Sequence, residues 1–326
     1  MNTKHIYLGL LGAALVFMAA SCSSNQTEGE KILKQSDFPA PPVAEVHPDT
    51  FVNFGKQRID NYYWMKDKTN PKVIEYIKAE NAYTDTVMAS TRDLQQKIYD
   101  EILGRIKEDD ESYPTYDNGY YYYSRTEKGK QYRTYCRRKG SMDAPEEVIF
   151  DVNKLAAGKQ AFIFRGYIIS SDNSKAAYFY NETGSYAEFT MKVRDLASGQ
   201  DVGFTVEGAA SVAWANDNRT LFYSAIDHTL RSSKIFRREL DAAEGTLVYE
   251  EKDAKFSTYV SATKTKQFIF ITCGSSTTSD ERYISADRPT DPFKVFLPRT
   301  KDVEYNVYAH ADRFFIRYKD KEHLNG

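Results

Sequence analysis

Cysteine and histidine are scarce in this chain, which has three cysteines and five histidines among 326 residues. No CxxC pair and no Cys/His spacing typical of zinc ligands occurs, so we expect neither a metal nor a cofactor. Cys136 and Cys273 could form a disulfide outside the cytoplasm, but they lie far apart in the sequence. The pattern favours two buried, free thiols over a disulfide.

A large charge of one sign and a long apolar run are also missing. The formal net charge is −2, so no basic field is available to neutralise phosphates, which argues against a nucleic-acid partner. After residue 20 no apolar run approaches the roughly 20 residues that a transmembrane helix needs. We therefore expect a soluble body behind the first residues.

The first residues have the features of an export signal. Lys4 supplies a positive charge, and Ile6 to Ala20 form an apolar run that is short for a membrane span but typical of a signal peptide. Ala19-Ala20-Ser21-Cys22 resembles the bacterial lipoprotein box, in which the cysteine is acylated and the signal is cut before it. We predict a signal peptide over residues 1–21, a lipid on Cys22 and a flexible tether over residues 22–37. The alternative is an ordinary secretory signal with an incidental cysteine.

Two helices are expected before residue 112. Asn70-Pro71 is a typical helix start, and apolar residues recur at helical spacing from Val73 to Val87. Ser90 is expected to cap a second helix, with an apolar stripe from Leu94 to Ile102 and a stop at Gly104. Each helix has one apolar face, and the sequence that follows offers no obvious cover for it.

From Tyr113 onward the residue pattern is that of a repeating β protein, rich in tyrosine and phenylalanine. A first hairpin is predicted from Tyr120–Tyr123 and Tyr132–Cys136. A unit of strand, polar turn and aromatic strand then recurs about every 44 to 48 residues, which fits a four-stranded propeller blade. Its copies are Tyr167–Tyr180, Ser211–Ser224, Tyr259–Ile271 and Asn306–Arg317. The strand that closes a blade is expected at Phe189–Leu196.

An ordered series of short motifs resembles the prolyl oligopeptidase family of serine peptidases, and the oligopeptidase B branch in particular. The motifs are Arg58–Asp67, Ala79–Thr84, Arg105–Pro114, Tyr120–Lys130, Leu247–Asp253 and Phe296–Tyr305. The resemblance implies a mainly β fold, with about four and a half of seven four-stranded blades over residues 113–326. It also implies that the helical segment over residues 38–112 belongs to an α/β-hydrolase domain.

The family's catalytic chemistry is not expected within these residues. Family members use a serine in a G-x-S-x-G elbow, followed by an aspartate and a histidine. Neither Gly274-Ser275-Ser276 nor Gly184-Ser185 has this pattern or a strand-turn-helix setting. We therefore predict no catalytic residue, assign no substrate-binding residue, and expect His47, His228, His310 and His323 to have surface or packing roles, with His5 in the signal.

Other charged segments are expected to be solvated. Glu108–Glu111 is interpreted as a turn at the first blade rather than a cation site. Arg137-Arg138-Lys139 and Arg237-Arg238 are interpreted as solvated strand ends. One departure from the family is the hairpin Gly184-Ser185-Tyr186, where relatives often have an acidic residue two positions after the glycine, and this puts any inter-domain contact there in doubt.

The leading hypothesis is the N-terminal, propeller-bearing part of an exported serine oligopeptidase, lipid-anchored to the cell envelope on its periplasmic or outer-membrane face. The resemblance implies short peptide substrates, cleaved after Arg or Lys, with the propeller gating their size; these 326 residues alone are expected to be inactive. One alternative is a lipid-anchored propeller that serves as a non-catalytic binding module or a vestigial fragment. Another is complementation by a separately encoded hydrolase domain.

Overall fold

The computed structural model describes residues 38–325. The predicted signal peptide, Cys22 and the tether lie outside the described residues. The chain divides between Ile106 and Lys107 into two compact units, each with its own internal contacts. No helix of the described part is long and apolar enough to span a membrane.

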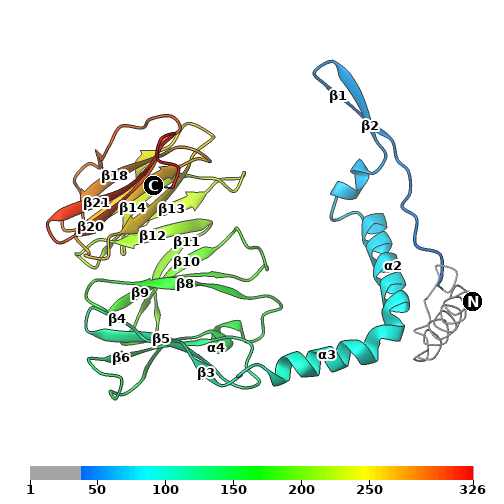
Figure 1. Ribbon diagram of the computed structural model, residues 1–326, viewed down its shortest axis with the longest axis horizontal. Coiled ribbons are helices and arrows are strands. Elements are labelled where there is room, and N and C mark those ends of the chain that lie inside the picture. The colour runs from blue at the N-terminus through cyan, green and yellow to red at the C-terminus, as the bar shows by residue number, and fades with distance from the viewer. Residues whose placement is uncertain (1–37, 326) are drawn as a thin grey trace, which may run out of the picture. The chain divides into compact units, whose positions relative to one another are not determined.

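The first unit contains a hairpin and two helices (Figure 1). Strands β1 (Asp49–Asn53) and β2 (Lys56–Asp60) pair antiparallel, and a 3-10 turn at Tyr63–Lys66 precedes helices α2 (Pro71–Met88) and α3 (Arg92–Gly104). As predicted, α2 begins at Pro71, and the Asn70 side chain caps it by accepting a hydrogen bond from the Lys72 amide. An ion pair of 2.8 Å between Lys72 and Glu45 holds the preceding segment near this helix start.

The predicted cap of the second helix at Ser90 is wrong. Ser90 lies in a 3-10 turn, Ala89–Thr91, that joins α2 to α3 without an extended residue between them. The backbone stays helical through Ala89 (φ −54°, ψ −38°), so no residue takes the extended conformation in which a side chain caps a helix. The apolar stripe of α3 is largely solvent-exposed: Leu94, Ile98 and Ile102 are 57%, 47% and 56% exposed.

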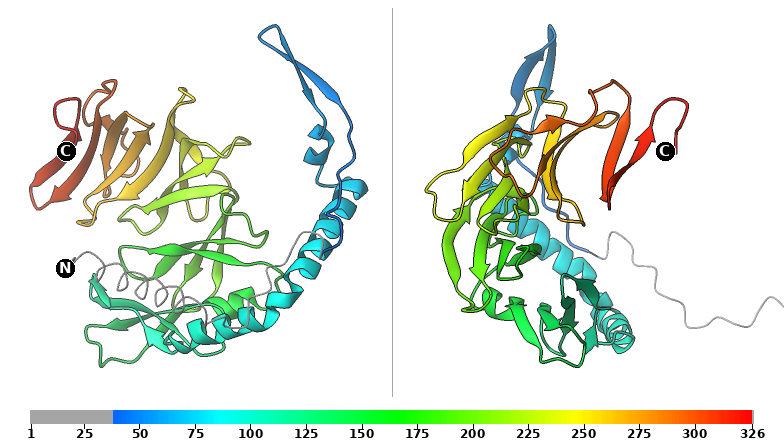
Figure 2. Two further views of the ribbon diagram at one scale, coloured as in Figure 1. Left: turned by 45° about the vertical axis from the view of Figure 1, so that its right-hand side comes forward. Right: turned by 90° about the vertical axis from the view of Figure 1, so that its left-hand side faces the viewer.

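The second unit is a series of antiparallel sheets that follow one another along the chain (Figures 1 and 2). Sheet 1 contains β3 (Asp110–Glu111), β4 (Thr115–Asp117), β5 (Tyr120–Thr126), β6 (Thr134–Lys139) and β7 (Glu147–Asp151), and is followed by the short helix α4 (Val152–Ala156). Sheet 2 contains β8 (Ile163–Ile169), β9 (Lys175–Asn181), β10 (Thr190–Asp195) and β11 (Asp201–Val206). Sheet 3 contains β12 (Ala209–Trp214), β13 (Thr220–Ile226), β14 (Ser232–Glu239) and β15 (Thr246–Glu250). Sheet 4 contains β16 (Ser257–Ala262), β17 (Phe268–Gly274), β18 (Ser279–Ser285) and β19 (Lys294–Val295), and a last hairpin pairs β20 (Glu304–His310) with β21 (Arg313–Lys319).

The predicted repeat is confirmed as the first hairpin of sheets 2, 3 and 4 and as the last hairpin. Its four copies are the hairpins β8–β9, β12–β13, β16–β17 and β20–β21. The segment predicted to close a blade, Phe189–Leu196, is wrong in position: it contains β10, the third strand of sheet 2, and β11 forms the edge. The sequence pattern failed here because β10 alternates buried and half-buried residues, whereas β11 buries Phe204 alone and otherwise has the polar, exposed character of a loop.

Hydrophobic side chains fill the space between successive sheets. One cluster, which includes Phe204 and Trp214, joins sheets 2 and 3, and another, which includes Phe222 and Ile271, joins sheets 3 and 4. Comparable clusters join sheet 1 to sheet 2, and sheet 4 to the hairpin β20–β21. Successive sheets therefore bury apolar side chains against one another, as propeller blades do. Among residues 38–325 no strand pairing joins the first sheet to the last.

Candidate functional site

The first strands of sheets 2, 3 and 4 follow one another side by side and share a hollow with β4 of sheet 1. This first-strand hollow has a volume of about 460 Å³. Its lining is mainly aromatic and aliphatic, and includes Tyr116, Tyr122, Tyr167, Ile168 and Trp214. Because strands of four sheets contribute to it, the hollow exists only when the sheets are stacked.

Polar bonds between sheets hold the first-strand hollow in shape. The indole Nε1 of Trp214 donates to the carbonyl of Ile168 at 3.0 Å, which ties sheet 3 to sheet 2. The Tyr122 hydroxyl donates to Asn173 Oδ1 at 3.0 Å, which ties sheet 1 to sheet 2. Lys266 of sheet 4 lies 3.5 Å from the carboxylate of Asp117 in sheet 1, so this contact spans the hollow.

The turns between the first and second strands form a belt of hydrogen bonds beside this hollow. Asn118, Asn173 and Asn218 have φ values of 46°, 60° and 55°, a left-handed conformation that asparagine tolerates better than most residues. Asn118 Nδ2 donates to the Ser171 carbonyl at 2.6 Å, and Asn218 Oδ1 accepts from the Asp172 amide at 2.9 Å. These asparagines therefore have two roles. They adopt the left-handed backbone conformation that the turns require, and their side chains hydrogen-bond one sheet to the next.

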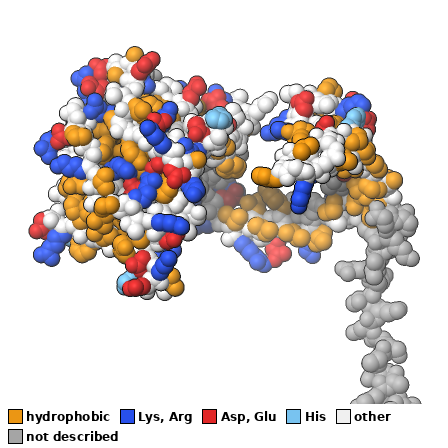
Figure 3. All heavy atoms as spheres, turned by 90° about the horizontal axis from the view of Figure 1, so that it is seen from above, with side chains coloured by type: hydrophobic (Ala, Val, Ile, Leu, Met, Phe, Trp, Pro, Cys, Tyr) orange, Lys and Arg blue, Asp and Glu red, His pale blue; other side chains and the backbone are white. Residues whose placement is uncertain are grey.

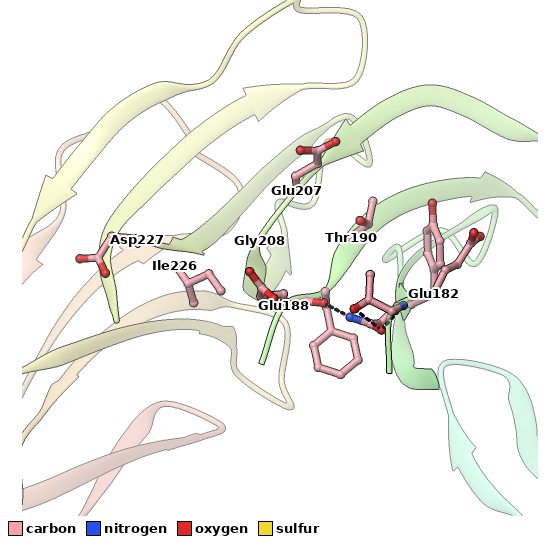
Figure 4. A pocket seen from close by; sticks show the side chains of 11 residues that line it. Glu182, Glu188, Thr190, Glu207, Gly208, Ile226 and Asp227 are labelled. Atoms are coloured by element: carbon pink, nitrogen blue, oxygen red, sulfur yellow. Dashed lines mark hydrogen bonds between the residues drawn. The ribbon is translucent and has the colours of Figure 1, made fainter. Parts of the chain in front are cut away.

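A second hollow, of about 570 Å³, lies at the opposite end of β9, between sheets 2 and 3 (Figure 4). Four carboxylates line this acidic hollow: Glu182, Glu188, Glu207 and Asp227. Figure 4 shows them spread around the hollow rather than converging on one point. They would give this end of the sheets a negative potential, which attracts cations without forming a single binding point.

The carboxylates of the acidic hollow differ in their partners. Glu182 pairs with Lys159 at 2.9 Å, and Thr229 donates to Asp227, which holds the pKa of Asp227 below its usual range. Glu188 and Glu207 form no ion pair with any described residue. The hairpin that carries Glu188 is held by Asn181, a buried side chain that donates to the Glu188 carbonyl.

A third charged feature is buried between sheet 4 and the end of sheet 3. Arg299 bridges two carboxylates, those of Glu251 and Asp280, which are 6% and 1% exposed. The guanidinium of Arg299 also lies 3.8 Å from the ring centroid of Phe256. Burial would raise the pKa of Glu251, but its hydrogen bond from Arg299 lowers the pKa below its usual range.

Several charged residues expected to be solvated are instead structural, which corrects that prediction. Arg137 is only 7% exposed; it pairs with Glu147 at 2.7 Å and donates to the Asn173 carbonyl at 2.8 Å. Arg238 lies over the ring of Phe204 at 4.4 Å. Their aliphatic stems cover strand surfaces while the guanidinium groups satisfy carbonyls, a behaviour that sequence pattern does not distinguish from a solvated strand end.

The comparisons with known proteins agree with this geometry. Residues 41–326 match the family described as "Prolyl oligopeptidase, N-terminal beta-propeller domain". The chain belongs to the prolyl oligopeptidase family. It is 36% identical to dipeptidyl aminopeptidase BI of Pseudoxanthomonas mexicana, over 94% of this chain and 44% of that protein. It is 30% identical to Protease 2 of Moraxella lacunata, over 84% of this chain and 41% of that protein.

Solved structures of the prolyl oligopeptidase family have the same fold. Oligopeptidase B from Leishmania major superimposes with a TM-score of 0.78 at 27% identity, over 86% of this chain and 42% of that one. Oligopeptidase B from Trypanosoma brucei superimposes with a TM-score of 0.77 at 23% identity, over 88% and 45%. The chain spans less than half the length of the relatives that it matches. The sheets described above are therefore blades of the family's N-terminal propeller.

The family's nucleophile motif has no counterpart at the serines considered from sequence. Gly274-Ser275 lies at a β17–β18 turn, where the Ser275 amide donates to the Thr278 carbonyl, so the setting is strand-turn-strand. All four described histidines are exposed, and none of them forms a hydrogen bond with a serine or cysteine side chain in the described part of the chain. Cys136 and Cys273 are buried and unpaired, as predicted. No group of three or more potential metal ligands occurs among residues 38–325.

Proposed function

We propose that this chain is the propeller-bearing part of an exported serine oligopeptidase that hydrolyses short peptides, with the propeller restricting substrate size. The observation that carries the proposal is the stack of sheets in which β4 of sheet 1 and the first strands of sheets 2, 3 and 4 share one hollow. A channel walled by rigid blades admits an extended peptide and excludes a folded domain. The catalytic serine, aspartate and histidine would be contributed by the hydrolase part of the family architecture.

The proposed substrate preference is cleavage after arginine or lysine. The relatives named dipeptidyl aminopeptidase BI, Protease 2 and oligopeptidase B support a peptidase, and the preference for basic residues rests on the resemblance to the oligopeptidase B branch. The acidic hollow adds physical support, because Glu188 and Glu207 have no cationic partner among the described residues and would draw basic peptides towards this end of the blades. We assign no residue of this chain a role in selecting arginine or lysine.

The experiment that tests the peptidase proposal is the size and labelling of the native protein in its source cells. An antibody against the propeller should detect a band near twice the 37.4 kDa of this chain, and a serine-directed fluorophosphonate probe should label the same band. A band of 37.4 kDa that the probe does not label would refute the proposal and favour a binding role. A labelled partner of separate size that co-purifies would indicate complementation instead.

We also propose that Cys22 carries the lipid that anchors the protein to the cell envelope, with residues 1–21 removed as a signal peptide. The supporting observation is the short apolar run that ends in Ala19-Ala20-Ser21-Cys22. Metabolic labelling with a palmitate analogue should mark the wild-type protein and leave Cys22→Ser unmarked. Equal labelling of both would refute the anchor, and processing of an unlabelled wild-type protein would indicate an ordinary secretory signal.

A further inference from the structure

The seam between sheet 4 and the hairpin β20–β21 contains a hollow of about 320 Å³. This seam hollow is lined by residues of β16, β17, β18 and β20, of which Ser261, Thr272, Glu281 and Asn306 are polar. Phe270 and Val307 form the apolar part of the wall of this hollow. The volume is at the lower end of the range of about 300–1,000 Å³ that is usual for small-ligand pockets.

Glu281 is a buried carboxylate in this hollow without a cationic partner. Glu281 is 4% exposed. Glu281 Oε2 accepts from the Val307 amide at 3.2 Å, and Oε1 accepts a longer bond of 3.4 Å from the Thr272 hydroxyl. No ion pair joins Glu281 to any residue of the described part of the chain. The Asn306 side chain also hydrogen-bonds to Glu281, so its partners are neutral groups, which compensate a buried negative charge only in part.

The nearby arginines are already paired on the other face of β18. Arg282 and Arg299 both contact Asp280, whose side chain points away from that of its neighbour Glu281 because residues alternate along a strand. Arg317 of β21 donates to Asn306 Oδ1 at 3.0 Å rather than to the carboxylate. Lys264 lines the same hollow but is exposed and forms no ion pair with a described residue. The Glu281 carboxylate therefore has neutral hydrogen-bond partners but no cationic partner among the described residues.

We propose that the seam hollow binds an organic cation, an ammonium or guanidinium group such as the end of a basic side chain, with Glu281 as its counter-ion. Ser261 and Thr272 supply hydroxyl oxygen atoms that accept the remaining N–H groups. A divalent metal fits less well, because one carboxylate is too few for the six to eight oxygen ligands that Ca²⁺ takes. The site does not depend on peptidase activity, since all its residues lie within the propeller.

Burial supports this assignment by raising the pKa of Glu281 to about 7. A bound cation stabilises the carboxylate, so binding below pH 7 must displace a proton from Glu281. Lys264 and Tyr308 line the site, Arg317 and Tyr305 lie beside it, and Asp280 acts on Glu281 only through its charge, from the other face of β18. With a pKa near 7, the ionised fraction of Glu281 falls about tenfold between pH 8 and pH 6, and the affinity for the cation falls by about the same factor.

Calorimetric titration of the full chain with three probes at low ionic strength tests the proposal. The probes are N-acetyl-argininamide, its neutral isostere N-acetyl-citrullinamide, and putrescine. We expect the arginine compound to bind about tenfold more tightly at pH 8 than at pH 6, with proton release at pH 6, and the citrulline compound to bind at least tenfold more weakly. Binding of putrescine as well would indicate a general amine site, and its failure a guanidinium site; both agree with the proposal.

Two matched variants locate the site. Glu281→Gln should lose at least tenfold in affinity for N-acetyl-argininamide at pH 8, while Glu304→Gln, on the adjoining strand β20, should bind as the wild type does. Equal binding by wild type and Glu281→Gln, equal affinity for the citrulline compound, or no binding of any cation would overturn the proposal. If Glu281→Gln does not fold, the isostere and pH comparisons on the wild-type chain still decide the question. Lys264→Gln should bind more tightly, because it removes a positive charge at the rim of the hollow that repels the incoming cation.

Discussion

Replacing Arg299 by methionine should destabilise the propeller more than any exposed arginine replacement. Arg299 bridges the buried carboxylates of Glu251 and Asp280 and packs on Phe256. Methionine keeps most of the stem and its apolar contact but removes the positive charge. Two carboxylates that are 6% and 1% exposed would then lack this partner.

The magnitude follows from the cost of an uncompensated buried charge. Removing one partner of a buried ion pair typically destabilises a protein by about 3–5 kcal/mol. Arg282 still contacts Asp280, so Glu251 accounts for most of the loss, and we expect about 3 kcal/mol at pH 8. In the wild type the pKa of Glu251 is lowered, so its stabilising contribution is present above its unfolded pKa and is lost as the pH falls. In Arg299→Met the Glu251 carboxyl can take up a proton, so the loss of stability relative to the wild type should be smaller at pH 5 than at pH 8.

Urea denaturation followed by circular dichroism at pH 8 and pH 5 measures both effects. Arg288→Met is the matched control, because the Arg288 side chain is 68% exposed and, among the described residues, forms its ion pair with Asp291 at 3.3 Å, so its loss should cost less than about 0.5 kcal/mol. If Arg299→Met loses no more unfolding free energy than Arg288→Met, the reasoning is refuted. A loss of equal size at both pH values would also refute it.

Three further predictions concern the contacts between blades and the burial of the two thiols. Asn218→Ala should lower stability by about 1–2 kcal/mol and Asn218→Gly by less, in thermal melts, because glycine tolerates the φ of 55°. Trp214→Phe should cost about 1–2 kcal/mol, since the Ile168 carbonyl loses its donor, and amide exchange should speed up at the junction of sheets 2 and 3. Cys136 and Cys273, whose pKa values burial raises to about 12 and about 11, should resist iodoacetamide at pH 8 in the folded protein and react in urea, as peptide mass mapping would show. Rapid native labelling of either thiol would contradict this burial.

Local sequence was sufficient for the elements whose pattern repeats. Asn70-Pro71 marks the start of α2 because the cap and the proline act within one turn of the helix. Each hairpin of the repeat could be located because its first two strands are aromatic-rich and separated by a polar turn. The third and fourth strands could not be told apart, because β11 and β15 are edge strands with half-exposed patterns that resemble loops.

The sequence by itself determined the repeat period, the propeller family and the helix start, and it favoured free thiols at Cys136 and Cys273 without deciding between them and a disulfide. Only the tertiary structure decided which charges are buried and with whom they pair. Arg137, Arg299 and Glu281 have partners or neighbours that are distant in sequence, and the free energy of a charge depends on that surrounding dielectric and on those partners. For the same reason, the first-strand hollow and the seam hollow arise from stacking between sheets, which no local pattern contains.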